Sequence, residues 1–369
     1  THPTMSRKRV ILSVINDLSG DQRIHRIASS LVESAYEVLV VGRKLPDSLP
    51  LSGRPYQTHR MRLLFKRGKL FYLEYNFRLL LFLLFTRVDI LNANDLDTLL
   101  PNYLVSKLRS KSLVYDSHEY FTEVPELIDR PRTRAIWLWL ERRLFPRLPK
   151  VYTVNPSIAN IYQETYGNKV SVIRNLPFGR LFPLQAASRN VLIYQGAINL
   201  GRGIDLMIEA MQHLPEAELW IVGKGDVLEK MKALADSLSL GERVKFWGFV
   251  ALEHLPAITA QARIGLSLEE DRGANYRFAS PNKVYDYIQA GLPVLVSDLP
   301  EMRALVESYE VGAVLPFAQR QAERLADLLR AMLTDEVALN TWRERCRVAA
   351  KELNWEAEKE KLQEIYDGL

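Results

Sequence analysis

The chain has 369 residues, a length that accommodates two domains with a sizeable apolar core each. Hydrophobic residues make up 47% and charged residues 25% of the sequence, which excludes a disordered or fibrous protein and favours an ordinary soluble globular one. The single cysteine, Cys346, excludes an intrachain disulfide and a cysteine metal cluster, and it fits a reducing, cytoplasmic compartment.

Short β-branched runs alternate with amphipathic stretches, which is the βαβ pattern of a parallel sheet covered by helices on both faces. In the first half, strands are predicted at residues 10–15, 38–41, 89–92, 113–116, 151–154 and 170–173. Pro and Gly then interrupt the pattern, and the stretch 174–189 has no clear periodicity, so we predict an interdomain linker there.

The pattern resumes after the linker. Strands are predicted at residues 191–195, 219–222, 244–246, 264–268, 294–297 and 311–315, and helices at 322–333, 339–353 and 355–366. The sequence therefore predicts an α/β protein with Rossmann-like domains at residues 1–180 and 181–352, followed by a helix at 353–369 that packs on the first domain.

Charge is divided unevenly between the halves. Residues 1–180 contain 28 Lys/Arg and 16 Asp/Glu, a balance of +12, whereas residues 181–369 contain 21 and 28, a balance of −7. The basic first half predicts contact with anionic lipid headgroups at the inner face of a membrane or with a phosphorylated acceptor, and solvated surface charge is the alternative. We expect no nucleic-acid partner.

The segment 66–87 combines basic flanks with a run of seven apolar residues, 79–85. A run of this length cannot span a bilayer, which requires about 20 apolar residues. Two interpretations remain: an interfacial helix that docks on a membrane, or a helix buried beneath the sheet.

Two glycine turns follow predicted strands in the second half. The turn at 194–203 contains Gly196 and Arg202 and leads into a predicted helix, so its backbone, the helix N-terminus and the guanidinium predict a phosphate site. The second turn supplies Gly223 but has Leu228 where a dinucleotide fingerprint has its third glycine. A nicotinamide or flavin site is therefore not predicted.

A third motif begins at Pro281, which can start a helix. Lys283 and Asp286 are spaced three residues apart and share one face of that helix. The lysine could meet a diphosphate and the carboxylate could accept hydrogen bonds from a ribose, and a surface ion pair is the alternative.

Together these motifs resemble the donor-binding domain of family 4 retaining glycosyltransferases. The resemblance includes the Arg202 turn, Ile-Val-Gly-Lys-Gly at 221–225, Val-Lys-Phe-Trp-Gly-Phe-Val at 244–250 and Ala-Gly-Leu-Pro-Val at 290–294. It implies a GT-B fold, in which two Rossmann-like domains face each other across a cleft, and transfer of a sugar from a nucleotide-diphosphate sugar to a glycan or lipid-linked acceptor. It also implies retention of anomeric configuration.

The resemblance implies roles for single residues in the second domain. Gly196 and Arg202 would contact the donor diphosphate, Asp286 the ribose, and the backbone around Gly248 and Phe249 the nucleobase. We also assign to donor binding Gly20, Gly223 and Lys283. The family's acidic position eight residues before Asp286 is Phe278 here. For the carboxylate near the sugar, Glu269, Glu270 and Asp271 at the end of a predicted strand are candidates, and we choose Glu270.

In the first domain, Gly20 is all that remains of the family's glycine-rich loop. Asp21 and Arg23 follow it, and their Asp-Gln-Arg form resembles a bacterial subgroup of family 4; helix capping by Asp21 is the competing explanation. The resemblance places His118 near the reacting sugar, where an imidazole can hydrogen-bond it and stabilise developing charge, although a structural histidine is equally compatible.

Glu119 is an adjacent carboxylate. We assign to the acceptor side Asp21, Arg23, Asn94, Asp95 and Glu119. We predict no required metal or other cofactor besides the donor, because the match of residues 95–97 to a D-x-D metal motif is too short to be informative. Two other classes of function stay open: a nucleotide-sugar epimerase of similar fold and a non-catalytic sugar- or nucleotide-binding protein.

Overall fold

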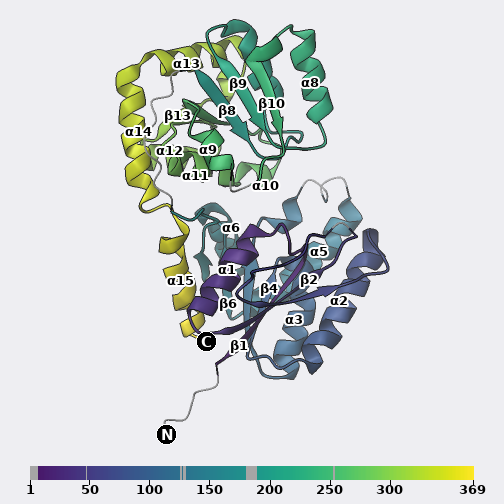
Figure 1. Cartoon of the computed structure of the whole chain (residues 1–369). Helices are drawn as coiled ribbons and strands as arrows, with labels where there is room; N and C mark the ends of the chain where they lie inside the picture. Colours follow the sequence, from purple (N-terminus) through teal and green to yellow (C-terminus); the bar gives the residue numbers. More distant parts are fainter. Residues whose placement is uncertain (1–6, 47, 125–126, 128–129, 180–188, 252–253) are drawn as a thin grey trace. The chain divides into compact units, whose positions relative to one another are not determined.

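The computed structural model describes residues 7–46, 48–124, 127, 130–179, 189–251 and 254–369. The chain divides into two units (Figure 1). The first unit comprises Thr1–Asn175 and Glu358–Leu369, and the second comprises Leu176–Ala357. Of the predicted linker, residues 180–188 lie outside the described part of the chain.

The first unit contains a seven-stranded parallel sheet of order β3-β2-β1-β4-β5-β6-β7. Its strands are β1 (Arg9–Asp17), β2 (Glu37–Arg43), β3 (Gln57–Met61), β4 (Ile90–Asn94), β5 (Ser112–Ser117), β6 (Lys150–Thr153) and β7 (Val170–Val172). Its helices include α1 (Gln22–Glu33), α2 (Gly68–Phe85), α3 (Leu96–Leu108), α5 (Pro131–Leu144) and α6 (Pro156–Tyr166), with short 3-10 turns at Phe121–Glu123 and Phe145–Arg147.

The central strands form because their side chains are buried on both faces. In β1, Val10, Ile11 and Leu12 are all fully buried, which is the continuous apolar run of a covered parallel sheet. Strand β3 was not predicted. Its first three residues, Gln57 to His59, are polar and exposed because β3 is an edge strand, so it lacks the apolar signal.

The second unit contains a six-stranded parallel sheet of order β10-β9-β8-β11-β12-β13. Its strands are β8 (Val191–Gln195), β9 (Glu218–Val222), β10 (Val244–Gly248), β11 (Ile264–Ser267), β12 (Val294–Ser297) and β13 (Gly312–Leu315). Its helices include α7 (Ile204–Ala210), α8 (Leu228–Ser237), α9 (Leu255–Thr259), α10 (Ala274–Arg277), α11 (Asn282–Gln289), α12 (Pro300–Tyr309), α13 (Ala322–Thr334) and α14 (Glu336–Ala350), with 3-10 turns at Met211–His213, Gly241–Arg243 and Phe317–Gln319.

The second sheet separates two apolar cores. Along β8, Leu192 and Tyr194 belong to the core on one face, whereas Val191 and Ile193 belong to the core on the other. This alternation follows from the two-residue period of a strand. The prediction of two α/β domains with parallel sheets is confirmed.

The last helix, α15 (Trp355–Asp367), begins in the second unit, and its residues from Glu358 onward belong to the first. Glu358 Oε2 accepts a hydrogen bond of 2.9 Å from Arg174 N, and Lys359 forms an ion pair of 3.0 Å with Glu33 at the end of α1. Further along, Tyr366 hydrogen-bonds Asn92 of β4.

Strand order reverses once in each sheet, between β1 and β4 in the first and between β8 and β11 in the second. In open α/β sheets, ligands bind outside the carboxyl ends of the strands at such a switch point. The fold therefore indicates one candidate site in each unit.

Candidate functional site

A buried ion pair occupies the switch point of the second sheet. Glu269, two residues after β11, is completely buried, and its Oε2 accepts a hydrogen bond of 2.7 Å from Ser267 Oγ. Lys283, at the start of α11, donates to the other carboxylate oxygen. Burial would raise the pKa of Glu269, but the Lys283 charge holds it below its usual value, whereas burial lowers the pKa of Lys283.

Arg202 adds a second cation from the turn between β8 and α7. Its Nη1 lies 3.8 Å from Glu269 Oε1, and its guanidinium carbon lies 5.3 Å from the centre of the Tyr276 ring. The side chain is 28% exposed, and its Nε has no hydrogen-bond partner among the described residues. Arg202 therefore retains donor capacity for an anion that reaches this turn.

Asp286 lies one turn beyond Lys283 on α11 and is half-buried. Its Oδ2 accepts a hydrogen bond of 3.3 Å from Gln195 Nε2, and Gln195 Oε1 in turn accepts one of 2.7 Å from Thr259 Oγ1. The buried Gln195 thus orients the carboxylate that the sequence assigns to the ribose. Sequence reasoning did not select Gln195, because a single glutamine at a strand end carries no pattern.

The glycine turns stack on one another through their backbones. Gly196 N donates to Val222 O at 2.9 Å, and Gly223 N donates to Gly248 O at 2.8 Å. A Cβ at Gly223, whose φ is +145°, would lie 1.8 Å from Gly196 O. The fold itself therefore requires glycine at position 223, whereas the sequence interpretation attributed this residue to approach of a ligand. At Gly196 (φ +134°) the nearest contact of such a Cβ is Lys283 Cε at 3.3 Å.

Gly248 and Phe249 form the next turn along this edge. Gly248 has a φ of +68°, and Phe249 is 70% exposed. The Lys224 Nζ lies 5.1 Å from the centre of the Phe249 ring, so this exposed aromatic side chain has a cation over one face. The turn offers an aromatic surface beside the two glycine turns.

The structure separates the adjacent acidic residues after β11. Glu270 is paired on the surface with Arg272, at 2.6 Å, and Asp271 is paired with Arg277, at 2.8 Å. Glu269 is the carboxylate that contacts both Lys283 and Arg202. Glu269 is thus the buried carboxylate beside the two cations, whereas Glu270, which we chose from the sequence, has a surface partner, and its role near the sugar stays a prediction.

The switch point of the first sheet carries a second charged cluster. Arg23 of α1 forms a bidentate contact with the buried Asp116 of β5, at 3.1 and 2.7 Å, and donates to Ile173 O at 2.9 Å. His118 Nε2 lies 3.0 Å from Asp116 Oδ2, and His118 Nδ1 lies 3.3 Å from Asp95 Oδ2. The imidazole therefore bridges two carboxylates.

These contacts define the electrostatics of the cluster. Burial alone would lower the pKa of His118, but Asp95 and Asp116 outweigh it and raise the pKa to about 9. Burial would raise the pKa of Asp116, but the Arg23 and His118 charges hold it below its usual value. Asp95 has a φ of +60°, a strained conformation that is concentrated at functional sites. His118 is thus an imidazolium at neutral pH, with both ring nitrogens paired.

Neighbouring polar groups are less accessible. Asn94 is buried and donates to Ser13 O at 3.0 Å, and Asp97 is buried, so that its pKa is raised well above the usual value. Arg23 is only 4% exposed and orders Asp116, and its assignment to the acceptor side stays a prediction. Sequence reasoning missed Asp116, whose partner Arg23 is 93 residues away.

The remaining predicted residues of the first unit lie around the same edge. Asp21 caps α1, because its Oδ1 accepts a hydrogen bond of 3.0 Å from Ile24 N, as the competing explanation proposed. Gly20 is exposed, and a Cβ there would meet nothing within 4 Å. Glu119 O accepts from Ser117 Oγ at 2.9 Å, and its charge contributes to the raised pKa of Asp97.

The described residues contain neither a candidate metal-binding cluster nor a helix that could span a membrane. No group of three or more His, Cys, Asp or Glu side chains in this part of the chain is arranged to hold a metal ion. Within the same ranges, no helix combines the length and apolar character needed to cross a bilayer.

Comparison with known proteins gives matches over both units. Residues 21–176 match the family described as Glycosyltransferase Family 4, and residues 182–353 match Glycosyl transferases group 1. The lipopolysaccharide glucosyltransferase WaaG of Escherichia coli is 29% identical over 49% of this chain and 47% of its own length. A GDP-mannose-dependent alpha-(1-6)-phosphatidylinositol monomannoside mannosyltransferase of Mycobacterium tuberculosis is 29% identical over 36% of each chain. The aligned regions thus span about half or less of these curated relatives.

Solved structures share the fold over the whole chain. HepE of Anabaena, solved in complex with UDP, superposes with a TM-score of 0.76 and 17% identity, covering 98% of this chain and 100% of that one. A sucrose-phosphate synthase of Thermosynechococcus elongatus gives a TM-score of 0.76 at 20% identity, over 98% and 99% of the two chains.

The two doubly wound units, each with a charged site at its switch point, define the GT-B class of glycosyltransferases. Within that class, the chain belongs to family 4, whose two halves match it in order. The family resemblance that the sequence predicted is confirmed.

Proposed function

We propose that this protein transfers a sugar from a nucleotide-diphosphate sugar to a glycan or lipid-linked acceptor with retention of configuration. One observation carries the proposal: Arg202 and Lys283 place two cations around a glycine turn at the switch point of the second unit. In a chain of family 4, this is the charge arrangement that stabilises a departing diphosphate. WaaG and the mycobacterial mannosyltransferase are both named for sugar transfer, which supports the same activity.

The second unit supplies the donor contacts in this proposal. Arg202 uses the exposed part of its guanidinium on the diphosphate, while Glu269 fixes the positions of both cations. Asp286, oriented by Gln195, accepts hydrogen bonds from the ribose. The turn at Phe249 provides a surface against the nucleobase. Because these charges are already ordered, little reorganisation is needed when negative charge develops on the leaving group.

The first unit contributes the His118 bridge. We place the sugar at its Nδ1 side, where the contact to Asp95 is the longer of the two, at 3.3 Å. A sugar hydroxyl that takes over this contact would meet an imidazolium held in place by Asp116 at 3.0 Å. The imidazolium would donate a hydrogen bond there and hold the sugar hydroxyl in position.

The donor site is tested by thermal shift with UDP, GDP, ADP, TDP and CMP and their sugar conjugates. We expect selective stabilisation by one nucleotide diphosphate, lost in Arg202→Ala and Asp286→Ala. Removing the Arg202 contact should weaken diphosphate binding by about 1.5 to 3 kcal/mol, or roughly 10- to 100-fold. The surface variants Arg324→Ala on α13 and Asp236→Ala on α8 are matched controls. Equal loss in the controls, or no loss in the site variants, would refute this assignment.

The reaction class is tested by product analysis. Proton NMR of the glycosylated acceptor should show the same anomeric configuration as the donor, and an inverted product would contradict retention. Consumption of the donor without an acceptor, giving an isomerised sugar, would favour the epimerase alternative. Tight nucleotide binding without turnover across donors and acceptors would favour a binding protein.

We also propose that the first unit docks on a membrane surface through α2. The helix buries a stripe of apolar side chains, Phe71, Tyr75, Leu79 and Leu83, at four-residue spacing. Its opposite side is apolar but exposed: Leu73 is 67%, Phe77 59% and Phe85 86% exposed. The buried interpretation of the segment 66–87 therefore describes one side of α2, and the interfacial interpretation concerns its other side.

The charge around α2 supports docking on an anionic surface. Basic residues Lys66, Arg67 and Lys69 lie at its start and Arg87 lies just beyond its end. Exposed apolar side chains flanked by cations are typical of interfacial helices. A lipid-linked acceptor would be presented at such a surface, and the phosphatidylinositol monomannoside named for the mycobacterial relative is of that kind.

Docking is tested by cosedimentation with vesicles of phosphatidylcholine and phosphatidylglycerol. We expect Phe77→Asp to weaken binding and added salt to weaken it further, because both burial and charge contribute. Phe317→Asp, an exposed aromatic of the second unit, is the matched control. Binding that is indifferent to salt and to Phe77→Asp would exclude this surface.

A further inference from the structure

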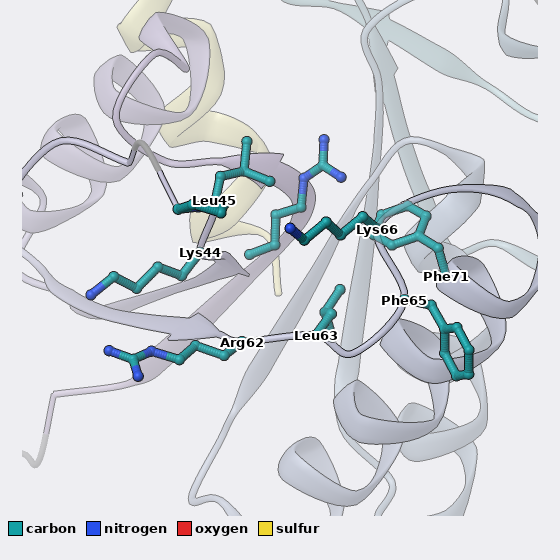
Figure 2. Close-up of a pocket in the computed structure, with 9 residues that line it drawn as sticks. Lys44, Leu45, Arg62, Leu63, Phe65, Lys66 and Phe71 are labelled. Atoms are coloured by element: carbon teal, nitrogen blue, oxygen red, sulfur yellow. The ribbon is translucent and has the colours of Figure 1, made fainter.

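The first unit contains a pocket of about 360 Å³ (Figure 2), and the charged cluster around His118 is not part of its described lining. It lies where β2 and β3 end and the loop to α2 begins, which is the carboxyl edge of the sheet. Four of its lining residues are cations: Arg43, Lys44, Arg62 and Lys66. The other described lining residues are apolar, and none of them is acidic.

The loop that carries two of these cations is held in place by α2. Glu74 accepts hydrogen bonds from Leu64 N and Phe65 N, both at 2.9 Å. Arg78 donates to Arg62 O at 3.1 Å and forms an ion pair of 2.7 Å with Glu74. The carboxylate of Glu74 is thus engaged outside the pocket, where it orders the loop backbone.

The strand side of the pocket is ordered as well. Lys44 N donates to Met61 O at 2.8 Å, which joins the ends of β2 and β3. The Arg43 guanidinium carbon lies 5.0 Å from the centre of the Phe71 ring, and its Nε is buried without a hydrogen-bond partner among the described residues. Figure 2 shows Lys44 and Arg62 extending in the same direction and Lys66 reaching across from the other side of the pocket.

We propose that this pocket binds a phosphate ester of the acceptor. Four cations that share one concave site without a described carboxylate in its lining require an anion of high charge density, and phosphate supplies several acceptor oxygens to each donor. Arg43 and Arg62 can each form a bidentate contact, and the two lysines add charge from opposite walls. The inference rests on the proposed function, since it names the chemistry of the acceptor.

Two sources can present this phosphate: a phosphorylated, water-soluble glycan or the headgroup of a lipid-linked acceptor. Phe65 at the pocket is 44% exposed, and the exposed face of α2 begins directly after this loop. The pocket and that face are therefore neighbours, which would suit a phosphate whose lipid chain lies against α2. The experiment below separates the two sources.

The test is residue-resolved lysine acetylation followed by mass spectrometry, with inorganic phosphate as the first probe. We expect phosphate to protect Lys44 and Lys66 several-fold. Arg62→Gln should raise the phosphate concentration needed for protection by about tenfold, because one charge-assisted contact is lost. Lys150 and Lys169 serve as internal controls, since they lie at the opposite, amino edge of the same sheet and should show no protection.

Further probes identify the source. Protection by glucose 6-phosphate but not by glucose would indicate a soluble phosphorylated acceptor, and protection by vesicles of phosphatidylcholine with phosphatidic acid, but not phosphatidylcholine alone, would indicate a lipid phosphate. Protection of Lys44 and Lys66 no greater than that of Lys150 and Lys169 with all of these probes overturns the proposal. The nucleotide thermal shift of Arg62→Gln should equal that of wild type, so failure of the pocket is distinguishable from failure of the donor site.

Discussion

The bridge at His118 can be tested through a single pKa. The increase from 6.5 to about 9 corresponds to roughly 3 kcal/mol of net stabilisation of the imidazolium, after the cost of its burial has been subtracted from its attraction to the two carboxylates. Asp95→Asn removes the charge 3.3 Å from Nδ1 and keeps the shape of the side chain. An opposite charge at this distance shifts a pKa by roughly 1 to 3 units, so we expect the pKa of His118 to fall from about 9 to roughly 6 to 8.

The sign of the pH dependence follows from the same values. Because the folded pKa of His118 is higher than the ordinary 6.5, the stabilisation is complete below about pH 6.5 and is lost as the pH rises through about 9. The first unit of the wild type should therefore lose roughly 3 kcal/mol across this window, and Asp95→Asn should lose less. Unfolding monitored below pH 6.5 and above pH 9 measures this difference.

The direct assay is NMR of histidine-labelled protein titrated from neutral to alkaline pH, with the His118 signal assigned from His118→Asn. Asp97→Asn is the matched control, because Asp97 is a buried carboxyl group two residues from Asp95, whereas the ion pairs of His118 are with Asp95 and Asp116. An ordinary pKa in the wild type, or an equal decrease in Asp95→Asn and Asp97→Asn, would refute the bridge.

Two further predictions concern the second unit. Gly223→Ala should lower the free energy of unfolding of this unit, measured in urea, by about 2 to 4 kcal/mol, because the new Cβ would overlap a carbonyl oxygen and φ is +145°. Gly20→Ala in the first unit is the control and should change the free energy of unfolding by less than about 0.5 kcal/mol. Equal effects of the two substitutions would contradict the stacked turns. Lys283→Met leaves Glu269 buried without its main partner and should cost about 3 kcal/mol, and Glu269→Met in the same chain should recover most of that loss. Glu270→Gln should have little effect on the free energy of unfolding. A loss equal to that of Lys283→Met would contradict the assignment of Glu269, rather than Glu270, as the buried partner of Lys283.

Sequence patterns were sufficient for the sheets wherever strands are buried on both faces. Strand β1 was predicted because Val10 to Leu12 are a continuous apolar run, and β3 was missed because an edge strand needs apolar residues on few positions. Which face of α2 packs against the core could not be predicted, because apolar residues are too many rather than too few. A helix that is apolar on every side has no periodicity to show which stripe, here Phe71 to Leu83, faces the core.

The sequence predicted the motifs that form the candidate sites, but it did not predict which charged residues pair with one another. A pattern identifies strand ends, glycine turns and helix starts, since these are local. The helix start at Pro281 selected Lys283 and Asp286, whereas the family resemblance placed His118 at the site. We chose Glu270 over Glu269 because adjacent carboxylates after a strand are equivalent in sequence. Only the fold decides which of the two turns inward toward Lys283.

Both units place a buried carboxylate, Glu269 or Asp116, at the switch point with a cation from a helix beside the sheet, Lys283 or Arg23. The connections of the two central strands leave toward opposite faces, so no helix covers the space between their carboxyl ends. A carboxylate buried there is stable only when it is paired, and breaking such a pair costs far more than losing a surface one. These cations are therefore held in place by the fold itself, which is the preorganisation that stabilisation of a charged transition state requires.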